Sequence, residues 1–267
     1  MGRMRRFLPF LKKPPVISVI RLNGMIAAGQ RGLNDASTAT MIDRAFTKGK
    51  PKAIALVINS PGGSPSQSSL IVARIRRLAE EKELPVTAFV EDAAASGGYW
   101  LACAADDIIV DENSIVGSIG VISASFGLHE MIARIGVERR VHTAGNSKSF
   151  LDPFRPEKEE DVERLRALQD QIHANFINHV KARRGDRLDS ERDLFTGDIW
   201  VGRQSVDVGL ADGIGHLVPT MKDRYGNLAK FVIHGPRRGL LRRFGLSIAA
   251  SATSELEERA LWARYGL

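Results

Sequence analysis

Short apolar runs alternate with amphipathic stretches through the first half of the chain. The apolar runs predict strands over residues 16–22, 53–58, 86–90, 107–110 and 116–122. A helix is expected over 34–48, and another after the turn at 59–63. The run at 53–58 is apolar throughout, which is typical of a strand covered on both faces. This alternation predicts an α/β fold with a largely parallel sheet.

A longer helix is predicted over residues 157–184. Apolar residues recur there at steps of three and four, at Val162, Leu165, Leu168, Ile172, Phe176 and Val180. Gly185 follows two arginines and is the expected C-terminal stop. The stripe predicts that one face of this helix packs against the rest of the protein.

The periodic pattern weakens beyond about residue 225. Gly235-Pro236 is typical of a linker, and Ser254 to Glu257 has the capping-box pattern that begins a helix. We therefore divide the chain into a basic arm at 1–13, a main domain at 14–225 and an extension at 226–267 that carries a short helix.

Composition is ordinary for a globular protein, but the charge is uneven. The chain has 267 residues, 43% hydrophobic and 26% charged, with a net charge of +7. Residues 1–13 carry five cations and no acid, and a second basic run spans 237–243. These runs fit either solvated tails or contact with an anionic membrane surface. No nucleic-acid motif with interleaved aromatics accompanies them, so nucleic acid is not an expected partner.

Several classes of protein and site are disfavoured. A single cysteine, Cys103, excludes an intrachain disulfide, and no cysteine or histidine cluster suggests a metal. No run reaches the roughly 18–20 apolar residues that span a bilayer, and Phe7 to Leu11 is too short for a signal-peptide core. We expect no metal or cofactor, and a protein that is cytoplasmic or peripheral at a bacterial inner membrane.

Two glycine-marked turns follow apolar strands, one at Gly62-Gly63 and one at Gly97-Gly98. Ser96 precedes the second pair, just before a predicted helix N-terminus, where free backbone N–H groups favour negative charge. A serine hydroxyl placed there can attack a carbonyl, and nearby amides can hold the resulting oxyanion. Each turn alone is also common as plain structure, so this chemistry needs a base.

The base is left open by the residues alone. Four histidines are candidates, His129, His142, His173 and His179, and His142 lies at a predicted strand end. Lysine can serve instead when burial among apolar groups keeps its amine neutral. Lys148 follows a predicted strand over 137–143, in the turn that begins at Ala144.

Four segments, in order and at matching distances, resemble the signal peptide peptidase A (protease IV) family, peptidase family S49. They are Asn59 to Gly63 (NSPGG), Ala95 to Tyr99 (ASGGY), Val116 to Val121 (VGSIGV) and Gly145 to Ser149 (GNSKS). The resemblance runs from about residue 14 to about residue 222. The spacing between Ser96 and Lys148 is similar to that of the short members with a single repeat.

The resemblance implies a role for each motif. Ser96 would be the nucleophile and Lys148 the general base, the amides of Gly63 and Gly97 would form an oxyanion hole, and Ser118 would orient the lysine. It also implies a ClpP/crotonase-like coil of βαβ units with outer helices. Members form homo-oligomers in which neighbouring subunits share a site, and they cleave hydrophobic or unfolded peptides such as remnant signal peptides.

One departure and two alternatives remain. Family members usually carry an N-terminal transmembrane anchor, which this sequence lacks, so the basic arm is expected to give peripheral membrane contact at most. A crotonase-like acyl-CoA hydratase or hydrolase would use the same turns with acidic residues, and Glu91 and Asp92 lie close to Ser96. A non-catalytic scaffold of the same fold is the other alternative.

Overall fold

The computed structural model describes residues 14–29, 32–145, 148–235 and 259–267. The basic arm, the basic run at 237–243 and the capping box at 254–257 lie outside these residues. The strands are β1 (Val16–Asn23), β2 (Ala53–Ser60), β3 (Val86–Ala95), β4 (Asp107–Val110), β5 (Ile115–Gly117), β6 (Ile199–Val201), β7 (Gly213–Ile214) and β8 (Lys230–His234). The α-helices are α1 (Asp35–Thr47), α2 (Pro65–Lys82), α3 (Gly97–Ala102), α4 (His129–Arg134), α5 (Glu159–Arg184), α6 (Gly202–Asp207) and α7 (Leu217–Tyr225).

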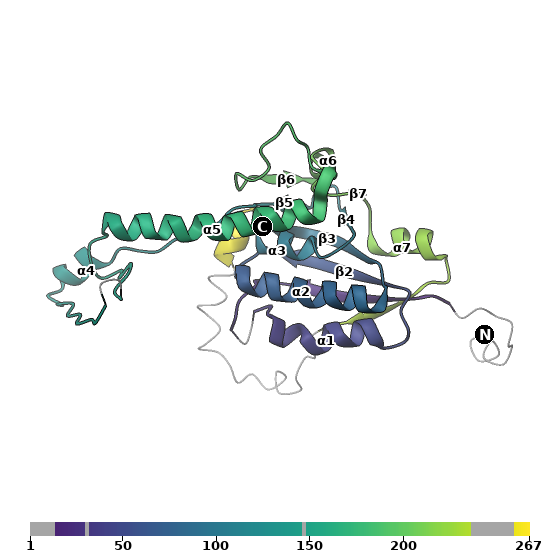
Figure 1. The fold of residues 1–267 in the computed structure, drawn as a ribbon, viewed down its shortest axis with the longest axis horizontal. Coiled ribbons are helices and arrows are strands. Elements are labelled where there is room, and N and C mark those ends of the chain that lie inside the picture. The colour runs from purple at the N-terminus through teal and green to yellow at the C-terminus, as the bar shows by residue number, and fades with distance from the viewer. Residues whose placement is uncertain (1–13, 30–31, 146–147, 236–258) are drawn as a thin grey trace.

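One mixed sheet of eight strands forms the centre of the protein (Figure 1). The order along it is β6-β5-β3-β2-β1-β8, with β4 and β7 continuing from β3 off this path. Only β6, paired with β5, is antiparallel among the strand pairs of the described residues. The chain passes from β1 through α1 to β2, and from β2 through α2 to β3, as successive βαβ units. The predicted α/β class, with a largely parallel sheet built from βαβ units and with outer helices, is confirmed.

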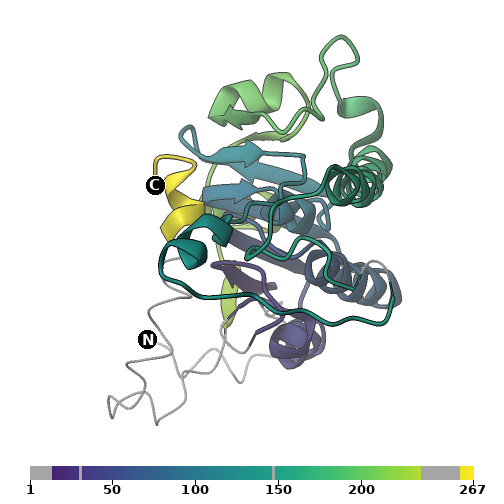
Figure 2. The ribbon, with the colours of Figure 1, turned by 90° about the vertical axis from the view of Figure 1, so that its left-hand side faces the viewer.

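Helices cover the two faces of the sheet unequally. The larger apolar cluster joins inward residues of the strands, such as Ile20 and Leu56, to α1, α2, α3 and the end of α5 (Figure 2). Residues that alternate with these along the strands, such as Val19 and Ala55, pack with Met221 of α7 on the opposite face. The apolar run at 53–58 is therefore buried on both faces, as predicted.

Two predicted strands differ from the structure. The strand expected over 116–122 ends at Gly117, because Ser118 adopts a left-handed backbone with φ of 50° that breaks the ladder. The strand expected over 137–143 is absent, and these residues form an irregular segment that pairs with no strand of the described residues. Val137 is 52% exposed, so its apolar character does not reflect burial within this chain.

α4, α5 and the segment between them form an arm that extends beyond the sheet (Figure 1). The helix predicted over 157–184 is confirmed as α5, and Gly185 caps it. Of its apolar stripe only Phe176 and Val180 are buried, and Leu168 is 46% exposed. Among the described residues, the outer half of this stripe is only partly covered, since Val162 and Leu165 are half-buried and Leu168 is exposed.

β8 pairs with β1 in parallel, so residues beyond 225 contribute to the main sheet. The division of the chain at 225 remains a prediction. In the described part of the chain, no helix combines the length and the apolar content needed to cross a bilayer.

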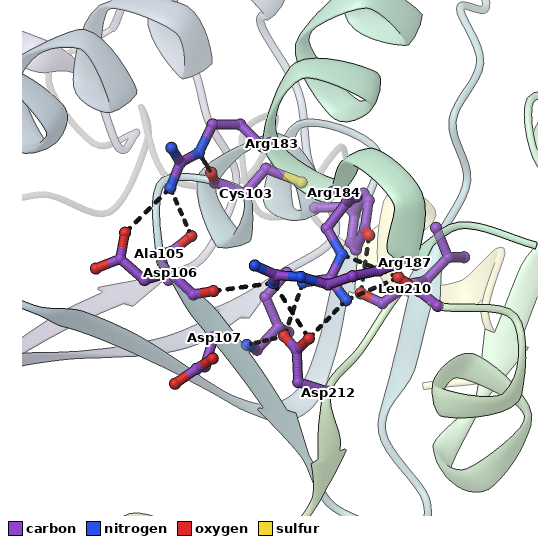
Figure 3. Close-up of polar contacts among 12 residues, drawn as sticks. Cys103, Ala105, Asp106, Asp107, Arg183, Arg184, Arg187, Leu210 and Asp212 are labelled. Atoms are coloured by element: carbon purple, nitrogen blue, oxygen red, sulfur yellow. Dashed lines mark hydrogen bonds and ion pairs between the residues drawn. The ribbon is translucent and has the colours of Figure 1, made fainter.

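A buried ion pair fastens the base of α5 to the sheet (Figure 3). Arg184 donates to both carboxylate oxygens of Asp212, at 2.7 and 3.0 Å, and to the carbonyl of Gly209. The backbone N–H of Ile108 also donates to Asp212, at 2.7 Å. Burial by itself would raise the pKa of Asp212, but these donors outweigh it and hold the pKa below its usual value.

Asp212→Ala is expected to lower the free energy of unfolding by about 3–5 kcal/mol, because it leaves the buried Arg184 guanidinium without its counter-charge. Urea unfolding checks this. Asp207→Ala removes an exposed carboxylate and serves as the control, with an expected change within about 0.5 kcal/mol. Equal midpoints for the two variants would show that the pair does not hold α5 in place.

Candidate active site

Ser96 lies on a sharp turn between β3 and α3. Its backbone has φ of 52° and ψ of −121°, a conformation that non-glycine residues rarely adopt and that stores strain. The turn is held because the Ser96 N–H donates to the Gly117 carbonyl, while the Ser96 carbonyl accepts from Tyr99 and Trp100. Its side chain caps no helix amide and is half-buried. This geometry leaves the hydroxyl available at the end of the strand, as in other strained strand-to-helix elbows.

A second turn, after β2, lies beside the Ser96 elbow. Ile26 bridges to it, donating to the Gly62 carbonyl at 2.8 Å and accepting from Ser64 at 2.7 Å. In a parallel bridge of this kind the residue between, Gly63, points its own N–H to the other side. Gly63 has φ of +135°, and a Cβ there would lie 2.0 Å from the Ile26 carbonyl oxygen. Only glycine fits this close approach.

The amides of Gly63 and Gly97 come together in space. A Cβ built on Gly97 would lie 3.3 Å from the Gly63 nitrogen and 2.6 Å from Ser68 Oγ. Among the described residues neither the Gly63 nor the Gly97 N–H donates to another group. These two neighbouring N–H groups, next to the Ser96 residue, could together bind an oxyanion.

Ser118 directly follows β5. The carbonyl of Gly117, the last residue of β5, accepts the hydrogen bond from the Ser96 N–H. Ser118 is 8% exposed, and its N–H donates to the Asp198 carbonyl at 2.7 Å. The hydroxyl of Tyr265 donates to Ser118 Oγ at 3.3 Å. The structure thus brings Ser118 to the same strand-end region as Ser96, with its hydroxyl contacted from the end of the chain.

Lys148 is not brought to this region within one chain. It is exposed, and it belongs to the segment between α4 and α5. Figure 1 shows this segment at the outer end of α5, away from the sheet. Asn146 and Ser147 of the predicted turn lie outside the described residues. The predicted site is therefore split, with Ser96, Gly63, Gly97 and Ser118 at the sheet and Lys148 on the arm.

The histidines considered as bases contact groups other than Ser96. His179 stacks on Trp100 with ring centroids 5.3 Å apart, and burial lowers its pKa to about 4. His173 Nε2 lies 3.0 Å from the Ile119 carbonyl, and His142 is exposed on the arm. Among the contacts of the described residues, none joins a histidine to Ser96.

The acidic residues near Ser96 are engaged elsewhere. Glu91 pairs with Arg21 at 3.2 Å, and Asp92 accepts from the side-chain amide of Asn59. Both precede the last three residues of β3, so they lie before the elbow along the strand. The contacts of Glu91 and Asp92 thus do not support the alternative in which they act as the acid and base of a crotonase-like hydratase.

Comparison with known proteins identifies the family. Residues 78–225 match peptidase family S49. The chain is 46% identical to a Brucella melitensis protein named Na(+)/H(+) antiporter NhaA, over 100% of this chain and 39% of that protein. It thus spans about two-fifths of that relative's length. Identity to the chloroplastic serine protease SPPA of Arabidopsis thaliana is 31%, over 75% of this chain and 31% of that protein.

Two further comparisons complete the picture. A putative protease of Methanocaldococcus jannaschii is 32% identical, over 61% of this chain and 52% of that protein. A mutant of a membrane-bound stomatin-specific protease of known structure superposes with a TM-score of 0.48 at 14% identity, over 83% of this chain and 99% of that one. Because the residues that match the family make up more than half of the sequence, this chain belongs to peptidase family S49.

Proposed function

We propose that this protein is a serine endopeptidase in which Ser96 is the nucleophile and Lys148 the general base. The observation that carries the proposal is the strained Ser96 elbow beside the unengaged amides of Gly63 and Gly97. A hydroxyl at a strand end, next to two convergent N–H donors, suits attack on a peptide carbonyl. Membership of a peptidase family supports the same reaction.

The proposed chemistry proceeds in two stages. The neutral amine of Lys148 takes the Ser96 hydroxyl proton as Oγ bonds to the carbonyl carbon, and the amides of Gly63 and Gly97 hold the tetrahedral oxyanion. Lys148 then returns the proton to the leaving amine as the C–N bond breaks, which leaves an acyl-enzyme on Ser96. Water, deprotonated by the same amine, cleaves the ester and restores the serine. Ser118 would orient the amine through its hydroxyl.

We further propose that the lysine comes from a neighbouring copy of the chain. The support is the arm, which carries Lys148 away from its own sheet, together with exposed apolar residues on α4 and on the segments before and after it. These are Ile122, Phe126, Met131, Ile135 and Val137, each more than half exposed, and α4 buries none of its residues. A surface of this kind marks an interaction site. Docking of the arm over a neighbour's sheet would bury both the apolar side chains and the lysine stem, and burial is what a neutral amine requires.

The proposed substrates are hydrophobic or unfolded peptides, such as remnant signal peptides. If neighbouring copies of the chain enclose the site, an extended peptide can reach Ser96, whereas a folded protein cannot. We propose that the basic N-terminal residues 1–13, which lie outside the described residues, make peripheral contact with a membrane.

Gly97→Ala is expected to lower kcat by about 100- to 1,000-fold, because the new methyl group stands 3.3 Å from the Gly63 nitrogen, in the space where the oxyanion would sit. Hydrolysis of a fluorogenic hydrophobic peptide measures it. The methyl group would also crowd Ser68 Oγ, so Gly97→Ala with Ser68→Ala relieves the clash and is expected to stay equally impaired.

Gly213→Ala is the matched control, since a Cβ there meets only Ile109 at an ordinary 3.7 Å. It should keep nearly full activity. Recovery of activity in the Gly97/Ser68 double variant would mean that packing, and not the paired amides, explains the loss.

A further inference from the structure

The last described segment of the chain reaches the candidate active site. Residues 259–263 are helical, and Tyr265 follows in a turn held by its N–H to the Trp262 carbonyl. The Tyr265 hydroxyl donates to Ser118 Oγ at 3.3 Å and lies 3.5 Å from the Pro61 carbonyl oxygen. Pro61 and Ser118 follow β2 and β5, so this hydroxyl touches both strand ends that flank the Ser96 elbow.

Leu267, two residues after Tyr265, is 53% exposed and forms part of the rim of a hollow. The hollow measures about 530 Å³ and lies over the middle of β3 and neighbouring residues of β1 and β2, beside the residues that follow β4 and the start of α7. Its lining includes Arg21, Phe89, Glu91, His216 and Leu267. Figures 1 and 2 both show the segment at 259–267, in yellow, against the end of the sheet and close to the start of the arm.

We propose that residues 262–267 are an internal peptide ligand of this site, with Tyr265 on Ser118 and Leu267 at the neighbouring hollow. The ligand class that the site accepts is then a peptide with an aromatic residue followed two positions later by an aliphatic one. The effect on activity rests on the proposed function, whereas the docking itself does not.

Docking of this segment opposes assembly of the proposed dyad. Ser118 is the residue that would orient the partner subunit's Lys148, and the Tyr265 ring and its helix stand beside that hydroxyl. A serine hydroxyl can accept two hydrogen bonds, so the competition is for the space around Ser118 rather than for its lone pairs. Release of the segment would open the site to the lysine and to substrate together.

Hydrogen exchange in the full-length chain tests the docking without reference to activity. A helix of this length does not persist alone in water, so protection of the amides in 262–267 reports that the segment is docked. Tyr265→Phe removes the hydroxyl and is expected to speed their exchange about fivefold, which corresponds to about 1 kcal/mol for one hydrogen bond. Tyr225→Phe, which removes a half-buried hydroxyl on α7, should leave it unchanged.

Peptide hydrolysis tests the consequence. Tyr265→Phe is expected to raise turnover up to about fivefold, and an added peptide of residues 259–267 to inhibit it. Unprotected amides in the wild type, equal exchange in the two variants, or a fall in turnover would overturn the proposal. Protection that Tyr265→Phe weakens, in a protein with no peptidase activity, would support docking and count against the proposed function instead.

Discussion

Ser96→Ala and Lys148→Ala are each expected to reduce hydrolysis of a hydrophobic peptide by about 10⁴-fold or more. The first removes the attacking oxygen and the second removes the group that takes its proton. The residual rate in both should be similar, because a nucleophile and its base act as one unit. The measurement is initial rate at saturating substrate, with the unfolding midpoint as a check on the fold.

Matched controls separate chemistry from damage. Ser69→Ala changes an exposed serine on α2, and Lys158→Ala changes an exposed lysine at the start of α5, on the same arm as Lys148. Both should retain nearly full activity. If Lys148→Ala were as active as Lys158→Ala, the lysine would be an ordinary surface residue and the base would have to be sought elsewhere.

Mixing the two inactive variants is expected to restore activity. In the proposed assembly each site takes Ser96 from one subunit and Lys148 from its neighbour, so a random mixture rebuilds about a quarter of the sites. Activity should therefore rise from near zero to about a quarter of the wild-type rate when Ser96→Ala and Lys148→Ala chains are dissociated and reassembled together. Rates measured as a function of mixing ratio should peak at equal amounts.

A double variant carrying both substitutions is the control for this experiment. Mixed with wild-type chains it can only dilute intact sites, and mixed with either single variant it should restore nothing. Failure of the two single variants to complement, in an assembly shown by light scattering to contain both, would place serine and lysine in the same subunit.

Much of the fold could be predicted because apolar runs report burial directly. β2 is buried on both faces and its sequence is apolar throughout, while α5 ends where Gly185 follows two arginines. The same signal fails on the arm. The run at 137–143 has the composition of a strand, yet within one chain it is exposed coil. Its exposed apolar residues are consistent with the contact to a neighbouring chain proposed above.

The site was predictable in part. The glycines at 62–63 and 97–98 mark the two turns, and a Cβ built on Gly97 would lie 3.3 Å from the Gly63 nitrogen. The role of their amides as an oxyanion hole stays a prediction. Composition could not reveal the positive φ of Ser96 and Ser118, because a serine in a left-handed turn looks like any other serine. Tyr265 gave no signal either, since its contact with Ser118 spans 147 residues and follows no local pattern.

The rate at which a fluorophosphonate modifies the assembled protein tests the central claim most directly. Such a reagent bonds to an activated serine oxygen with loss of fluoride, and digestion followed by mass spectrometry identifies the serine. We predict a single adduct on Ser96 that forms at least about 100-fold more slowly in the Lys148→Ala protein. An adduct on another serine, or equal rates with and without the Lys148 amine, would contradict a lysine-activated Ser96.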